Sequence, residues 1–329
     1  MKRVLITGAG GFIGGHLAAT LLKKNYNVIC VDVKPLNNWY QLFDKSLNYS
    51  FDLNKYENCI KITKKIDYVF NLACNMGGMG FIEKNKADCM LSVLINTNLL
   101  RASKINKVKR YMYASSACVY NSKKQKKTSI SGLKETDAYP ADPEDGYGWE
   151  KLFSERMCRH FKEDYKLDVR IIRLHNVYGP FGTYSGGREK APAAICRKVA
   201  DAKMKKLRKI NVWGDGKQTR SFMFIDDCIK GILKIFYSDY SKPINLGSSE
   251  KVSINKMINI VEKIAKYKIK KNYQLNKPKG VRGRSSDNSL IKKLLNWEPK
   301  TKLVDGLGIT YNWIFLNIKT NKKSNKFIK

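Results

Sequence analysis

The sequence contains few acidic residues and no long apolar segment. Its 329 residues include 28 Asp and Glu against 63 Lys and Arg, which gives a net charge of +35. No apolar run approaches the ~20 residues that a membrane-spanning helix needs. The apolar start at residues 4–6 breaks at once into a glycine-rich loop, which is atypical of a signal peptide. We therefore expect a cytoplasmic protein with no membrane partner.

Paired cysteines are also absent. The eight cysteines are scattered singly, without a Cys-x-x-Cys motif. Neither a zinc site nor the dense disulfide framework of a small secreted domain is therefore expected. We predict reduced thiols and no metal.

The excess of basic residues would attract phosphates of any kind, including nucleic acid. The lysines are nevertheless spread along the whole chain, and only residues 319–329 form a basic tail, which we expect to be disordered. We interpret the charge as compositional bias that favours solubility, and keep a dedicated nucleic-acid role as the minority alternative.

Strand and helix signals alternate through the first half of the chain. Helical stretches at 14–24, 90–106 and 147–165 separate β-rich runs at 3–7, 27–33, 67–71, 110–115 and 168–174. This alternation predicts an α/β fold, a doubly wound parallel sheet of the Rossmann type. Further helices are expected at 192–203, 226–237, 253–266 (with Ser253 as N-cap) and 286–295.

The looser pattern after residue 174 predicts a smaller, mostly C-terminal domain that would bind the substrate. We expect residues 1–175 to form the first domain, with 225–247 returning to it. The second domain would then consist of residues 176–224 and 248–318.

A glycine-rich loop joins the first predicted strand to the first helix. Gly8, Gly11 and Gly14 allow the backbone to turn tightly and approach a pyrophosphate, and Phe12 and Ile13 lie between the last two glycines. At the end of the second strand, a carboxylate can accept hydrogen bonds from the adenosine ribose and would repel a 2′-phosphate. That carboxylate is Asp32, which otherwise would be a solvated strand-end residue. The predicted cofactor is therefore NAD.

Tyr147 and Lys151 lie at i and i+4 of a predicted helix and share one face. An ammonium beside a phenol stabilises the phenolate, which can then act as a base. With the glycine loop and Ser116 upstream, this pattern resembles the extended short-chain dehydrogenase/reductase superfamily. The resemblance implies hydride chemistry on a nucleotide-sugar and adds three cofactor contacts: Asp52, Leu72 and Ala73.

Ser116 and Cys118 would project from one face if the strand stays extended to that point. A free cysteine at a strand end is otherwise a small buried hydrophobe. Relatives that eliminate water carry an acidic residue here, whereas this chain has Ala117 and Cys118, which argues against a dehydratase.

Longer motifs at residues 75–80, 115–120, 186–192, 213–222 and 280–284 resemble the GDP-mannose 3,5-epimerases, and the similarity extends from about residue 3 to about residue 317. The resemblance implies that Cys118 and Lys190 form the acid/base pair. A ketone at C4 would acidify the hydrogens on C3 and C5. We expect Lys190 to lower the pKa of the thiol, which would make Cys118 a usable base.

The same resemblance implies a homodimer and a set of substrate contacts. Forked guanidinium donors suit a diphosphate, which favours the two arginines of this set over exposed charges. One departure is Asn75, where the family more often has Asp. The implied contacts are Gly77, Ser116, Ala117, Asn176, Glu189, Lys190, Ala191, Lys198, Gln218, Thr219, Arg220 and Arg284.

The predicted activity is therefore inversion of GDP-mannose at C3 and C5 to GDP-L-galactose, through transient oxidation at C4 by bound NAD. Two alternatives stay open. One is a related epimerase that acts on another nucleotide-hexose. The other is a non-catalytic Rossmann protein that binds RNA through its positive surface.

Overall fold

A seven-stranded parallel sheet forms the centre of the protein. The computed structural model describes residues 1–277 and 280–320. The strands lie in the order β11-β6-β5-β4-β1-β2-β3, and every neighbouring pair is parallel. Their bounds are β1 Arg3–Thr7, β2 Asn27–Asp32, β3 Leu47–Ser50, β4 Tyr68–Asn71, β5 Arg110–Ser116, β6 Asp168–Leu174 and β11 Ile244–Leu246. The predicted doubly wound parallel sheet is confirmed.

Helices cover both faces of this sheet because successive strand residues, which point to opposite faces, are apolar. In β1, Val4 and Ile6 pack into the core that holds α1 (Phe12–Lys23) and α8 (Ile225–Tyr237), whereas Leu5 points into the opposite core. That second core is closed by α2 (Tyr56–Thr63), α5 (Ser92–Ile105) and α6 (Asp145–Tyr165). Because the seven strands of this sheet are parallel, their carboxyl ends meet at one edge of the sheet.

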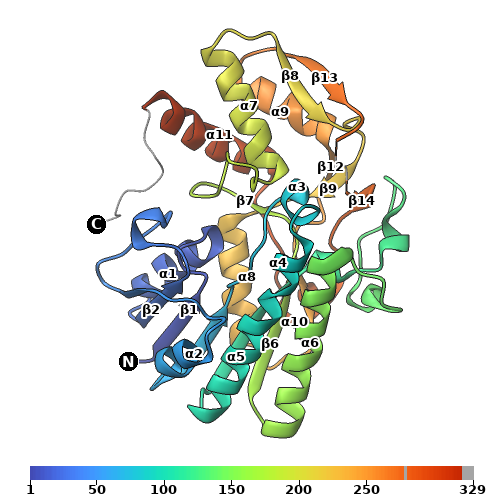
Figure 1. Cartoon of the computed structure of the whole chain (residues 1–329). Coiled ribbons are helices and arrows are strands. Elements are labelled where there is room, and N and C mark those ends of the chain that lie inside the picture. Colours follow the sequence, from blue (N-terminus) through green and yellow to red (C-terminus); the bar gives the residue numbers. More distant parts are fainter. Residues whose placement is uncertain (278–279, 321–329) are drawn as a thin grey trace.

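A second lobe lies above that edge, with α7 (Ala191–Met204), α9 (Ile254–Ala265) and α11 (Leu303–Lys319) beside a two-stranded sheet of β8 (Lys209–Trp213) and β13 (Lys270–Gln274) (Figure 1). One strand pair and one three-stranded sheet, both short, lie between the two lobes. They are β7 (Val177–Tyr178) with β10 (Met223–Phe224), and β9 (Thr219–Ser221) with β12 (Lys251–Ser253) and β14 (Gly283–Arg284). The remaining α-helices are α3 (Met79–Ile82), α4 (Lys86–Met90) and α10 (Ser289–Leu295).

The predicted elements differ from the structure mainly at their ends. The first helix begins at Phe12 rather than residue 14, and the helix predicted over 90–106 is broken between α4 and α5. Ser253 caps α9 as predicted, because its side chain accepts the backbone N–H of Lys256. The domain boundaries stay a prediction.

Several elements were not predicted, and they include α2, α3, α11, the edge strand β3 and the short strands that follow residue 176. The strand β3 is a short edge strand with mostly exposed residues, and α2 is a short helix. The helix α11 contains Gly306, Gly308 and several β-branched and aromatic residues, which are poor helix formers. Packing against α7 and α9 stabilises it instead. Within the predicted tail, Lys319 ends α11 and residues 321–329 lie outside the described residues.

Among the described residues, every helix is too short or too polar to cross a bilayer.

Replacing Leu5 by Ala should lower the free energy of unfolding by about 2–5 kcal/mol, because the residue is fully buried between β1 and the helices of one face. Urea denaturation followed by circular dichroism measures the change. The matched control is Leu47→Ala on the edge strand β3, where the side chain is 48% exposed. The control should change stability by less than about 0.5 kcal/mol.

Candidate active site

The loop between β1 and α1 has no room for side chains at its glycines. Gly8 has a φ of +73°, and a Cβ there would lie 2.9 Å from the carbonyl carbon of Leu72. A Cβ on Gly14 would lie only 2.3 Å from the carbonyl oxygen of Gly8. Glycine is thus required at both positions, and the first turn of α1 stays open to a phosphate group.

Asp32 ends β2 and is almost fully buried. Its Oδ1 accepts the backbone N–H of Lys34 at 3.1 Å. Leu72 and Ala73 follow β4 at the same sheet edge, where Ala73 N donates to Asn71 Oδ1 at 3.2 Å. Asp52 follows the edge strand β3 and accepts the N–H of Asn54. These residues suit an adenosine and its ribose, and the glycine loop suits a pyrophosphate, so the chain has a cradle that fits NAD.

Tyr147 and Lys151 lie in the first turns of α6 and are both buried. The Nζ atom of Lys151 is 5.6 Å from the centre of the Tyr147 ring. Burial raises the pKa of Tyr147 well above its ordinary value, and the positive charge of Lys151 acts in the opposite direction. The phenol therefore depends on Lys151 for any basic character.

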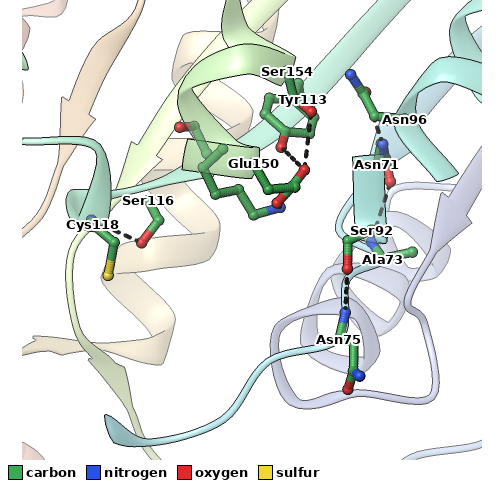
Figure 2. A network of polar contacts seen from close by, with 12 residues as sticks. Asn71, Ala73, Asn75, Ser92, Asn96, Tyr113, Ser116, Cys118, Glu150 and Ser154 are labelled. Atoms are coloured by element: carbon green, nitrogen blue, oxygen red, sulfur yellow. Dashed lines mark hydrogen bonds and ion pairs between the residues drawn. The ribbon is translucent and has the colours of Figure 1, made fainter. Parts of the chain in front are cut away.

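Glu150 holds Lys151 in place, and the sequence analysis did not select it. Its Oε2 is 3.4 Å from Lys151 Nζ. Its Oε1 accepts hydrogen bonds from Tyr113 and Ser154, each at 3.0 Å (Figure 2). Burial opposes the charge on Lys151, yet its acidic neighbours Cys74, Glu150 and Tyr147 raise its pKa, so the ammonium form persists.

The predicted shared face of Ser116 and Cys118 is wrong. The strand β5 ends at Ser116, and residues Ala117–Val119 form a 3₁₀ turn. The Oγ of Ser116 accepts the backbone N–H of Cys118 at 3.2 Å, as Figure 2 shows, and this cap starts the turn. Strand alternation therefore stops before Cys118. Both side chains still line one cavity, because the turn redirects the chain along its wall.

That cavity has a volume of about 470 Å³ and lies where the two lobes meet. It is lined by both lobes, with β5, α6, α7, β8 and β9 among the contributors. The predicted residues in its lining are Gly77, Ser116, Ala117, Cys118, Tyr147, Asn176, Glu189, Lys190, Ala191, Lys198, Gln218, Arg220 and Arg284. Two of the predicted catalytic and substrate-binding residues are not in the lining. Lys151 is buried behind it, and the hydroxyl of Thr219 donates to the carbonyl of Thr128 at 2.7 Å.

Cations dominate the polar part of this lining. Burial lowers the pKa of Lys190 and Lys198, and burial next to Arg284 lowers the pKa of Arg220 to about 10. The Oε1 of Gln218 is buried without a hydrogen-bond partner among the described residues. Several cations and an orphaned amide oxygen facing one cavity fit an anionic, hydrogen-bonding ligand.

The predicted lowering of the Cys118 pKa is not found, although Lys190 and the thiol do interact electrostatically. Burial raises the pKa of the thiol, and the charge of Glu144 raises it further. The cation that opposes them is Arg284, whose Nη1 lies 3.5 Å from the sulfur. The sequence analysis missed Glu144, although its place directly before the helix of Tyr147 is a local signal.

Lys190 precedes α7 in a loop that packs against residues 75–78. Gly78 N donates to the carbonyl of Arg188 at 3.0 Å, and a Cβ on Gly78 would lie 2.5 Å from the carbonyl oxygen of Glu189. Nη1 of Arg188 donates to Oδ1 of Asn75 at 3.0 Å. Asn75 therefore connects two loops and does not line the cavity. Its departure from the Asp of the family thus does not change the lining directly.

Comparison with known proteins agrees with this geometry. The profile of the NAD dependent epimerase/dehydratase family matches residues 4–247. GDP-mannose 3,5-epimerase 1 of Oryza sativa subsp. indica is 47% identical over 97% of this chain and 83% of its own length. The chain belongs to the GDP-mannose 3,5-epimerases of this family. The epimerase of Arabidopsis thaliana, at 46% identity over 97% of this chain and 84% of its own length, is similarly close.

Solved structures of the same family confirm the epimerase fold. UDP-glucuronic acid 4-epimerase from Bacillus cereus, in complex with UDP-glucuronic acid and NAD, has a TM-score of 0.79 at 28% identity and covers 95% of this chain and 98% of its own. UDP-glucose 4-epimerase from Thermotoga maritima, with a TM-score of 0.86 at 24% identity over 97% of this chain and 100% of its own, supports the fold alone. NAD, the predicted cofactor, is the cofactor named for this epimerase family.

Replacing Gly14 by Ala should strip the epimerase of bound NAD, because the new Cβ has no space beside the carbonyl of Gly8. The NAD released from purified, denatured protein measures the effect. Gly308→Ala is the control, since a Cβ there has nothing within 4 Å. It should keep the NAD content and raise stability by about 0.5–1 kcal/mol. Normal NAD content in Gly14→Ala would contradict the proposed cradle.

Proposed function

We propose that this chain inverts GDP-mannose at C3 and C5 to give GDP-L-galactose. The observation that carries the proposal is that Cys118, Lys190 and Tyr147 line one cavity although they come from three separate segments. Tyr147 suffices for oxidation and reduction at C4. Only exchange of carbon-bound hydrogens requires two further acid/base groups.

When bound, NAD supplies the acceptor and donor of hydride at C4, so that no external oxidant is consumed. The glycine loop and Asp32 would hold its pyrophosphate and ribose. Tyr147 would receive the proton of the C4 hydroxyl, with Lys151 stabilising the phenolate. The ketone at C4 makes the hydrogens of C3 and C5 acidic. Cys118 and Lys190 would then remove a proton and return one to the other face of the carbon.

Recognition of the nucleotide is proposed for the rest of the cavity. Arg220 and Lys198 supply positive charges that suit a diphosphate, and Arg284 adds a third while its nitrogens contact Gln125, Glu144 and Cys118. Trp213 and Gln274 come from the paired strands β8 and β13 and also line the cavity. An aromatic ring beside an amide side chain suits a nucleobase, which can stack and hydrogen-bond at once.

A reducing compartment is proposed for the protein, in keeping with its eight free cysteines. The cytoplasmic location and the homodimer stay predictions. So does the division into a cofactor-binding and a substrate-binding domain.

Incubation of the protein with GDP-mannose in D₂O tests the function. Deuterium should enter at C3 and C5, and NMR of the products identifies both the carbons labelled and the sugars formed. Cys118→Ala should slow deuterium uptake by about 10²–10⁴-fold, because it removes one of the two proton-transfer groups. Cys196→Ala is the matched control, since Cys196 is also a buried cysteine and does not line the cavity.

Inversion at C4 without deuterium uptake would refute this mechanism and support the alternative of another nucleotide-hexose. Parallel incubations with UDP-glucose and UDP-glucuronate identify that substrate. Tight RNA binding at physiological salt, together with no turnover of any nucleotide-sugar, would support the non-catalytic alternative.

A further inference from the structure

Glu144 is one of two carboxylates, with Glu189, in the wall of a cavity that is lined by five cationic side chains. It is the last residue before α6, and its side chain is only 15% exposed. Its Oε2 accepts a hydrogen bond from Arg284 Nη2 at 2.7 Å. The carboxylate also interacts with the thiol of Cys118. An anion at this place does not serve the binding of an anionic nucleotide-sugar, so it needs another explanation.

Arg284 connects the carboxylate to the sulfur. Its Nε donates to Gln125 Oε1 at 2.6 Å, its Nη2 donates to Glu144, and its Nη1 lies 3.5 Å from the sulfur of Cys118. A guanidinium is planar and rigid, so acceptors on two of its edges fix the direction of the third. Glu144 and Gln125 together therefore aim one N–H of Arg284 at the sulfur.

Burial and the neighbouring charges act on the pKa of Cys118 in opposite directions. Burial raises the pKa of Cys118, Glu144 raises it further, and Arg284 opposes both. Arg284 also holds the pKa of Glu144 below its ordinary value although burial acts the other way, so Glu144 is an anion that can accept an S–H hydrogen. The groups near the sulfur are Glu144 and Tyr147 of the α6 start, Arg284 of β14, Arg220 of β9 and Lys190 of the loop before α7.

We propose that Glu144 is a positioning residue for Cys118: it accepts the hydrogen of the protonated sulfur and, through Arg284, fixes the sulfur in the cavity. The inference rests on the proposed epimerase function. When the thiolate removes a proton, the C–H bond beside the C4 ketone breaks and its electron pair passes into the carbonyl to give an enolate. The proton forms an S–H bond on Cys118, and that hydrogen bonds to Glu144. Stabilising the protonated sulfur makes the thiolate a stronger base.

The variant Glu144→Gln separates this role from a merely structural one. Loss of the negative charge lowers the pKa of the thiol, so the midpoint of Cys118 alkylation by iodoacetamide should fall by about 1 pH unit. Mass spectrometry of the Cys118 peptide follows the reaction across pH. Deuterium uptake by GDP-mannose should nevertheless fall at least about tenfold at the high-pH plateau, because the thiolate is a weaker base. Local unfolding would also expose the thiol and slow the enzyme, so an unchanged urea denaturation curve of Glu144→Gln is the control that separates the two causes.

Two further variants complete the test. Asp142→Asn removes a carboxylate from the same loop that faces Ser122 instead of Cys118, and it should leave both readouts unchanged. Glu144→Asp keeps the charge but withdraws it by one methylene, and its alkylation midpoint should lie between those of the wild type and Glu144→Gln. If Glu144→Gln does not fold, the alkylation midpoint of Glu144→Asp is compared with that of the wild type, and a lower midpoint supports the proposal.

An alkylation midpoint that stays in place or rises, or an undiminished plateau of deuterium uptake, would overturn the role of Glu144. Failure of the proposed function looks different. In that case GDP-mannose incubated with the wild type in D₂O takes up no deuterium, while the alkylation profiles, which need no substrate, still report on the contact between Glu144 and Cys118.

Discussion

The start of α6 is packed against the backbone of Cys118, and the reaction centre depends on this contact. Glu144 N donates to the carbonyl of Cys118 at 2.9 Å. A Cβ on Gly148 would lie 2.5 Å from that same carbonyl oxygen, so only glycine permits the approach. Tyr147 and Lys151 belong to this helix start, whereas Cys118 follows the strand β5. One close backbone contact thus sets Tyr147 and Lys151, proposed for oxidation, and Cys118, proposed for proton transfer, at a fixed separation.

Lys190 reaches the same cavity by a different route. Its loop is fastened to residues 75–78 by the hydrogen bond between Gly78 and Arg188 and by the stacking of Arg188 on Phe81, with 3.8 Å between the guanidinium and the ring centre. This fastening joins a loop that follows β4 of the sheet to one that enters α7 of the upper lobe. The cavity therefore exists only when both lobes are in place.

Local sequence patterns predicted the main strands of the sheet well. They predicted the side-chain direction and the pKa of Cys118, at the edge of the sheet, less well. The strands β1 and β6 were predicted to the residue, because apolar residues in short runs between turn signals have few other structures available. The face shared by Ser116 and Cys118 was wrong because a serine cap started a turn that alternation cannot foresee. The predicted low pKa of the Cys118 thiol was wrong for a related reason. Burial, Glu144 and Arg284 decide the pKa of Cys118, and all three depend on packing.

By itself, the sequence determines the strand–helix alternation, the glycine loop with its capacity for NAD, and the Tyr147–Lys151 pair, because each depends on neighbours a few residues apart. Its long motifs also indicate the epimerase family. Only the tertiary structure decides that Arg284 lies between Glu144 and Cys118, and that two loops a hundred residues apart close one cavity. Such contacts join segments distant in the chain, and their energies depend on burial, which no local pattern contains.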